Sequence, residues 1–129
     1  MKSPLPKTVL IMEDDVGLRS TLTTVVEEHG FEVRACADAE EGLVLASVFK
    51  PTLVFCDVHL DRGDGRVVLT RLRADESLRD CQFVLMTGDW VGASQRASVD
   101  IGADGYLAKP FSIGEFMTCV EARFEQANL

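Results

Sequence analysis

Short runs of apolar residues alternate along the chain with segments in which apolar residues recur at helical spacing. The runs at 8–12, 52–56 and 82–86 are continuous and have the length of a strand. Runs of this kind are typical of strands that are buried on both faces of a sheet. Two further segments, at 31–36 and 105–108, complete a set of five predicted strands.

Apolar residues at spacings of three and four predict amphipathic helices between these strands. Asp38 and Ser112 are expected to cap two helices, because their side-chain oxygens accept hydrogen bonds from the first turn. Gly30 and Pro51 are expected to end the first two helices. The segment 88–102 gives the weakest pattern, since its apolar residues are small and poorly phased. The five predicted helices cover 18–29, 39–49, 67–74, 88–102 and 113–124.

This alternation predicts an α/β fold with one doubly wound, five-stranded parallel sheet flanked by five helices. Right-handed crossovers bring the carboxyl ends of all five strands to one edge, where open sheets of this kind bind ligands. The 129 residues fit a single domain. We expect it to cover 7–126, between a loose tail at 1–6 and a short end at 127–129.

The chain is acidic, with 13 basic and 21 acidic side chains and a formal net charge of −8. This charge argues against direct binding of nucleic acid or of an anionic membrane surface. No apolar run approaches the ~20 residues of a membrane span, and the first residues lack the apolar stretch of a signal peptide. We therefore expect a cytoplasmic protein without a membrane partner.

The cysteines are scattered, and no pair has the C-x-x-C spacing of a redox or zinc motif. We expect them to be reduced and to pack as small core residues. The two histidines, His29 and His59, have no cysteine or histidine at ligand spacing, which disfavours a zinc site. The four cysteines are Cys36, Cys56, Cys81 and Cys119.

Polar side chains directly follow four of the predicted strands. Glu13 and Asp14 follow the first strand, Asp57 the third, Thr87 the fourth and Lys109 the fifth. At one sheet edge the three carboxylates would repel one another, and a hard divalent cation such as Mg²⁺ resolves that conflict. One carboxylate can then accept a phosphoryl group, whose charge the ammonium and the hydroxyl group would meet.

Four segments resemble the signatures of bacterial response-regulator receiver domains, the CheY-like family. They are IMEDD at 11–15, VFCDV at 54–58, VLMTG at 84–88 and GADGYLAKPF at 102–111. Each signature is weak alone, but all four occur in order and at family-like separations, and the resemblance covers about residues 7–126. It implies the sheet order 2-1-3-4-5, with strands numbered along the chain.

The resemblance implies that Asp57 is the phosphoacceptor, which takes a phosphoryl group from a histidine kinase or a histidine phosphotransfer protein. It also implies a Mg²⁺ or Mn²⁺ site that includes Asp57 itself. In that site Asp14 is a direct ligand, and Glu13 reaches the metal mainly through water. The backbone carbonyl of His59 matches the third protein ligand of the family.

Further roles are implied for residues near the last two strands. Lys109 would pair with the Asp57 carboxylate and then with the phosphate. Thr87 would bond a phosphoryl oxygen, and Tyr106 would turn inward once the threonine has moved. Pro110 is expected to follow the lysine through a cis peptide bond.

The chain departs from the family pattern around the expected site. Asp61 stands where a proline is usual, so we expect the loop at 60–65 to be more polar and more mobile. Gly88 replaces the commoner alanine after the threonine and opens space above the phosphate. His59 and Asp89 occupy the variable positions that tune hydrolysis of the acyl phosphate.

The leading hypothesis is a phosphorylation-controlled switch in two-component signalling, acting through a partner or within a phosphorelay. A downstream protein is expected to bind the fourth and fifth strand–helix region. Trp90 is either an anchor for that partner or a cover for the start of the fourth predicted helix. As enzymatic activity, we expect at most self-phosphorylation from phosphodonors and autodephosphorylation.

The sequence leaves other functions open. The fold can serve as a docking or dimerisation module without phosphotransfer, and a homodimer through the fourth and last helices is compatible with the sequence. The chain can also be a receiver cut from a longer regulator or hybrid kinase. A Mg²⁺ phosphatase with an aspartyl-phosphate intermediate usually needs a second acidic residue two positions after the nucleophile, where this chain has His59.

Overall fold

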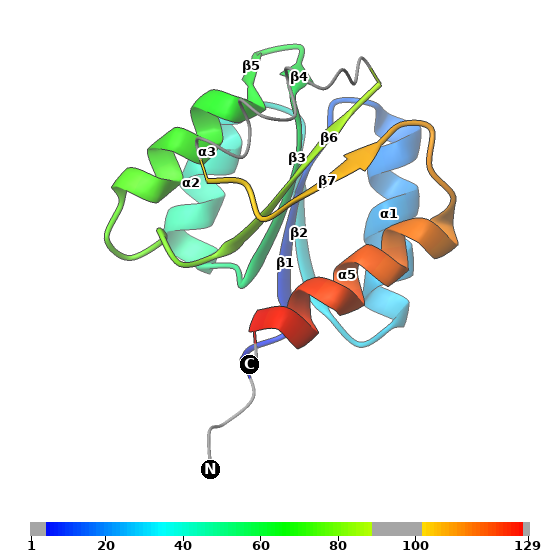
Figure 1. Cartoon of the computed structure of the whole chain (residues 1–129). Coiled ribbons are helices and arrows are strands. Elements are labelled where there is room, and N and C mark those ends of the chain that lie inside the picture. Colours follow the sequence, from blue (N-terminus) through cyan, green and yellow to red (C-terminus); the bar gives the residue numbers. More distant parts are fainter. Residues whose placement is uncertain (1–4, 89–101, 128–129) are drawn as a thin grey trace.

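A computed structural model of the chain describes residues 5–88 and 102–127 (Figure 1). Five parallel strands form its main sheet. They are β1 (Thr8–Met12), β2 (Glu32–Cys36), β3 (Leu53–Asp57), β6 (Gln82–Thr87) and β7 (Gly105–Ala108). Their order is β2-β1-β3-β6-β7, which confirms the expected doubly wound sheet.

Four helices lie in the described part of the chain. They are α1 (Val16–Glu28), α2 (Ala39–Phe49), α3 (Gly65–Ala74) and α5 (Ile113–Ala127). In Figure 1, α2 and α3 cover one face of the sheet, while α1 and α5 cover the other. The helix expected at 88–102 falls almost entirely on 89–101, outside the described residues.

Side-chain caps fix where the four described helices begin. The capping residues are Asp15, Asp38, Asp64 and Ser112, and the last of these was also expected from the sequence. The carboxylate of Asp15 accepts a hydrogen bond from the backbone N–H of Leu18 at 2.8 Å, and α1 begins directly after it. Asp38 accepts from the backbone N–H of Glu41 at 2.8 Å, which confirms it as the cap of α2. Each carboxylate satisfies an amide that has no partner within the helix.

The loop expected at 60–65 is a small antiparallel hairpin, so that expectation was wrong in part. Strand β4 (His59–Leu60) pairs with β5 (Gly63–Asp64), and α3 begins at Gly65, two residues earlier than predicted. Strands of two residues are too short to show alternation, and the glycines and charges of this segment are equally typical of a loop.

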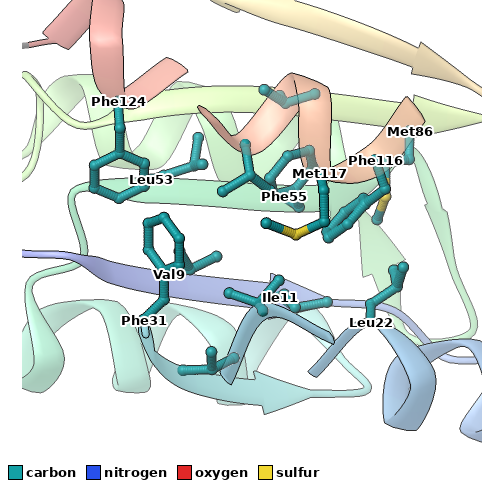
Figure 2. Packing of buried hydrophobic residues seen from close by; sticks show 14 residues of the cluster. Val9, Ile11, Leu22, Phe31, Leu53, Phe55, Met86, Phe116, Met117 and Phe124 are labelled. Atoms are coloured by element: carbon teal, nitrogen blue, oxygen red, sulfur yellow. The ribbon is translucent and has the colours of Figure 1, made fainter. Parts of the chain in front are cut away.

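The core consists of two apolar clusters, one on each face of the sheet. Successive side chains of a strand point to opposite faces, so Val9 and Ile11 join one cluster, while Leu10 and Met12 join the other. Figure 2 shows the first cluster, in which Phe116 of α5 lies against Phe55 of β3. Their ring centroids are 4.5 Å apart. Both faces of the sheet are therefore covered by apolar side chains, whereas the strand ends at one edge carry polar groups.

All four cysteines are free thiols, as expected. Cys36 and Cys56 are buried, while Cys81 and Cys119 are half-buried and pack against the core. Burial raises the pKa of Cys36 to about 12 and that of Cys56 well above its usual value. These thiols stay protonated at neutral pH. Within residues 5–88 and 102–127, no helix is both long and apolar enough to cross a membrane.

Gly65 lies where α3 meets the end of β3, and this contact leaves no room for a side chain. A Cβ atom at this position would lie 2.4 Å from the backbone oxygen of Asp57. We expect Gly65→Ala to lower the free energy of unfolding by about 1–3 kcal/mol, because backbone must move. Urea denaturation measures the change.

The matched control is Gly17→Ala, at an exposed position of α1 where the nearest atom would be 3.5 Å away. Alanine there should leave stability unchanged or raise it by up to about 1 kcal/mol. Equal effects of the two substitutions would contradict the close contact at Gly65.

Candidate functional site

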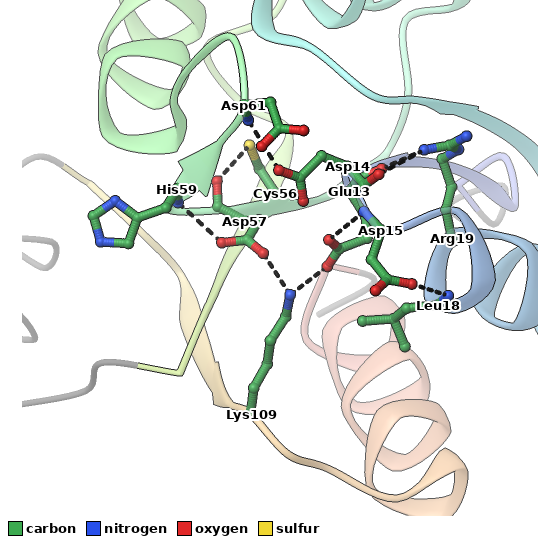
Figure 3. Close-up of polar contacts among 10 residues, drawn as sticks. All are labelled: Glu13, Asp14, Asp15, Leu18, Arg19, Cys56, Asp57, His59, Asp61 and Lys109. Atoms are coloured by element: carbon green, nitrogen blue, oxygen red, sulfur yellow. Dashed lines mark hydrogen bonds and ion pairs between the residues drawn. The ribbon is translucent and has the colours of Figure 1, made fainter.

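The carboxyl ends of four strands bring the expected polar residues to one edge of the sheet. Glu13 and Asp14 follow β1, Asp57 is the last residue of β3, Thr87 is the last of β6, and Lys109 follows β7. The strands are parallel, so these positions share one edge although they are far apart in the sequence. Figure 3 shows the Lys109 side chain reaching between Glu13 and Asp57.

Lys109 is the cation of this edge. Its Nζ atom donates hydrogen bonds to Oε1 of Glu13 and to Oδ2 of Asp57, each at 2.5 Å. Burial lowers the pKa of Lys109, but its bonds to the two carboxylates outweigh this effect and raise the pKa above its usual value. The ammonium therefore stays charged and partly neutralises two side chains that are almost completely buried.

The two neighbouring carboxyl groups after β1 are in different electrostatic environments. Burial raises the pKa of Glu13, which also accepts a hydrogen bond from the backbone N–H of Asp15. Partial burial acts in the same direction on Asp14, but hydrogen bonds with Glu13 and Asp61 lower its pKa below the usual value. Of these two groups, Asp14 is thus the one that more readily stays ionised.

Three carboxylates fit the requirements of a hard divalent cation. One oxygen from each of Glu13, Asp14 and Asp57 lies within 4.8 Å of the other two. These ligand atoms are all oxygens, which suits Mg²⁺ or Mn²⁺ rather than zinc or copper. The three carboxylates of the expected metal set therefore lie close together, and Asp14 is the half-buried one of the three.

The orientation of Asp57 is held by two donors on opposite sides. Lys109 binds Oδ2, and the backbone N–H of His59 donates to Oδ1 at 2.9 Å. The His59 ring is exposed and points away from the cluster in Figure 3. In this structure His59 thus contacts Asp57 through its backbone N–H.

The expected switch residues lie on the neighbouring strands. Thr87 is buried at the end of β6, and its backbone carbonyl accepts a hydrogen bond from the backbone N–H of Lys109 at 2.8 Å. Tyr106 is half-buried in β7 and pairs with Leu85. Since Thr87 is two residues beyond Leu85, Thr87 and Tyr106 share one face of the sheet.

The remaining expected residues flank the site or lie outside the described part. Among the described residues, a Cβ atom on the exposed Gly88 would meet only Lys109, at 3.9 Å. The Lys109–Pro110 peptide bond is cis, as the resemblance implied. Asp89 and Trp90 lie outside the described residues. An open pocket of ≈ 530 Å³ beside the site is lined by Asp15, Leu18, Gly88, Lys109, Pro110 and Phe111.

Two contacts of the site were not predicted from the sequence. Arg19 of α1 donates through Nη1 to the backbone oxygens of Glu13 and Asp14, at 2.8 and 3.5 Å. The backbone N–H of Asp61 donates to Oδ2 of Asp14 at 2.9 Å. For the first contact, the sequence did place Arg19 in the first turn of the predicted helix. A long side chain at that position can reach back to the preceding loop.

Comparison with known proteins identifies the family of the chain. The model of the response regulator receiver domain family matches residues 9–121. The chain belongs to this family. It is 32% identical over 120 residues to the DNA-binding dual master transcriptional regulator RpaA of Synechocystis, covering 93% of this chain and 50% of RpaA. It is 36% identical over 122 residues to the transcriptional regulatory protein PdtaR of Mycobacterium tuberculosis, covering 91% of this chain and 56% of PdtaR.

The fold of this receiver domain is also shared with solved structures. A CheY-like response regulator receiver domain protein from Methanospirillum hungatei aligns with a TM-score of 0.88 at 24% identity, covering 96% of this chain and 98% of the other. Receiver domains of this family interact with histidine kinases, and phosphorylation and Mg²⁺ are typical of them. The chain spans about half the length of the curated relatives it matches.

The pairing of Lys109 with two buried carboxylates predicts a pH-dependent loss of stability when the cation is removed. We expect Lys109→Met to lower the free energy of unfolding by about 1–3 kcal/mol near neutral pH, because Glu13 and Asp57 then repel each other without a counterion. Urea denaturation at about pH 7 and about pH 5 measures the loss.

The loss should shrink at the lower pH. Burial raises the pKa of Glu13 in the folded state, and removing the ammonium raises it further. An acid whose folded pKa is raised binds its proton more tightly when folded, so stability is gained as the pH falls through that pKa. Lys109→Arg keeps the charge and is the control. A loss that is equal at both pH values would contradict this electrostatic cause.

Proposed function

We propose that this receiver domain is a phosphorylation-controlled switch of two-component signalling, in which Asp57 accepts a phosphoryl group from a histidine kinase or a histidine phosphotransfer protein. The arrangement that carries the proposal is the Asp57 carboxylate, held between Lys109 and the backbone N–H of His59 at the acidic edge of the sheet. A carboxylate can act as a nucleophile and form an aspartyl phosphate.

In the proposed transfer, an Asp57 oxygen forms the new O–P bond as the N–P bond of the donor phosphohistidine breaks. The electron pair of the broken bond stays with the imidazole ring. Catalysis of phosphoryl transfer consists mainly of positioning and of stabilising charge on the three equatorial oxygens. The Lys109 ammonium is already beside Asp57 and supplies a positive charge that would stabilise the negative phosphoryl oxygens. The Thr87 hydroxyl group is expected to donate a hydrogen bond to one of these oxygens.

Glu13, Asp14 and Asp57 would hold a Mg²⁺ or Mn²⁺ ion, with the backbone carbonyl of His59 as the further expected ligand. When bound, the cation neutralises charge on the transferring phosphoryl group. The residues themselves contribute in different ways. Asp14 offers an ionised carboxylate nearest to solvent, and Asp57 is the acceptor.

The proposed signal leaves the site through β6 and β7. An added phosphoryl group brings negative charge and acceptor oxygens to one point. Thr87 and Tyr106 lie on the same face of these strands, so movement of the threonine toward the phosphate would free space for the ring. Moving such an equilibrium from mostly inactive to mostly active needs about 5 kcal/mol of differential stabilisation.

We propose that a downstream protein binds this fourth and fifth strand–helix region, with Trp90, outside the described residues, as a candidate anchor. A homodimer through the last helix is a further candidate. RpaA and PdtaR are named as transcriptional regulators. For this chain, with its net charge of −8, we propose a protein partner rather than direct contact with nucleic acid.

Phosphorylation of Asp57 is tested with a small phosphodonor. Incubation with acetyl phosphate and Mg²⁺ should add one phosphoryl group per chain, measured by intact-protein mass spectrometry. Hydroxylamine should remove it, because an acyl phosphate is labile to this nucleophile. Asp57→Asn should abolish the addition, whereas Asp80→Asn, which changes an exposed residue two positions before β6, should leave it intact.

The same experiment separates the alternatives. No mass increase in the wild type would favour a docking module without phosphotransfer. Steady release of inorganic phosphate from many organic phosphates would favour a phosphatase.

The metal site predicts that Asp57→Asn stabilises the metal-free protein but reduces the further stabilisation that Mg²⁺ gives. In metal-free buffer, Asp57→Asn should raise the free energy of unfolding by about 1 kcal/mol, since one of three crowded carboxylates is removed. Added Mg²⁺ should raise the melting temperature of the wild type by mass action, and that of Asp57→Asn by less. Equal increments in both proteins would show that Asp57 is not part of the metal site.

A further inference from the structure

The β4–β5 hairpin brings a residue to the acidic edge that the proposed mechanism does not yet use. Asp61 and Arg62 form the turn between the two strands. The backbone N–H of Asp61 donates to Oδ2 of Asp14 at 2.9 Å, across 47 positions of sequence. Figure 3 shows Asp61 beside Asp14, on the side away from Lys109.

This contact is held by the fold rather than by a loose loop. The backbone oxygen of Arg62 accepts a hydrogen bond from the backbone N–H of Ala39 at 3.0 Å, which ties the turn to the start of α2. Gly63 has a φ of 132°, and a Cβ atom there would lie 2.3 Å from Cβ of Ala39. The backbone of Gly65 donates to Val58 at 2.9 Å and closes the base of the hairpin.

Asp61 acts on Asp14 through two chemically distinct groups. Its backbone N–H is a donor that a proline would lack, and this donor favours the ionised form of Asp14. Its exposed carboxylate adds a fourth negative charge beside the three expected metal ligands. Figure 3 shows the Asp61 side chain beside the Asp14 carboxylate, so the two groups are close neighbours.

We propose that Asp61 is a positioning residue for divalent-cation binding. Its backbone N–H fixes Oδ2 of the expected ligand Asp14. Its carboxylate makes the electrostatic potential beside the three expected ligands more negative, which attracts a cation. This inference rests on the metal site of the proposed function. It implies that this chain binds Mg²⁺ or Mn²⁺ more tightly than the same chain with proline at position 61. A carboxylate has lone pairs enough to accept the N–H and still bind a cation.

The test separates the charge from the N–H with three substitutions, using binding of Mn²⁺ followed by the electron paramagnetic resonance signal of the free ion. Asp61→Asn and Asp61→Ala keep the N–H but lose the charge. They should weaken binding about two- to fivefold at low salt, and the difference should fall as salt screens it. Asp61→Pro loses both groups and should bind about tenfold or more weakly, with a gap to Asp61→Ala that persists at high salt.

Asp80→Asn is the control for removal of an exposed charge away from this edge, and it should bind Mn²⁺ as the wild type does. Thermal unfolding in a chelator checks that the hairpin variants are folded. If Asp61→Pro is unfolded, the salt-dependent weakening in Asp61→Asn and Asp61→Ala still decides whether Asp61 contributes to cation binding.

Wild-type affinity in Asp61→Asn, Asp61→Ala and folded Asp61→Pro overturns the inference. If the wild type binds Mn²⁺ and accepts a phosphoryl group while these variants bind equally well, only the role of Asp61 fails. If the wild type neither binds Mn²⁺ nor accepts a phosphoryl group, the proposed function fails as well.

Discussion

One ammonium group holds the functional edge together. Lys109 reaches from the loop after β7 to carboxylates that follow β1 and end β3, so it joins three strands across the sheet. Glu13 and Asp57 are almost fully buried, and burying such charges is unfavourable unless they are paired. The orientation of Asp57 depends on that pairing, because it fixes which Asp57 oxygen faces the cation and which faces the backbone N–H of His59.

The positions of the site residues were predictable because each follows an apolar run that fills a buried strand. Asp57 and Thr87 end their strands, and the parallel arrangement gathers them without any further information. The order of the strands was not in the pattern and came from the resemblance to receiver domains. The hairpin at 59–64 was missed because two-residue strands show no alternation.

Two parts of the site depend on backbone geometry, which residue types alone do not specify. Arg19 was placed on a predicted helix, but its bonds to the carbonyls of Glu13 and Asp14 require the conformation of the preceding loop. Asp61 was noted as a departure from the family pattern and interpreted as a sign of a mobile loop. The structure adds that its N–H donates to Asp14 and that a backbone contact between Arg62 and Ala39 ties the turn to α2.

The acidic edge is not the arrangement that would maximise stability, and the rest of the fold explains why it is tolerated. Lys109 pairs with two of the three clustered carboxylates, so this edge keeps an excess of negative charge that a bound cation would offset. The two apolar clusters lie on the faces of the sheet and are formed by residues such as Phe55 and Leu85, whose burial does not involve these charges. The receiver domain thus separates the interactions that maintain its fold from those at the edge where we propose that phosphorylation occurs.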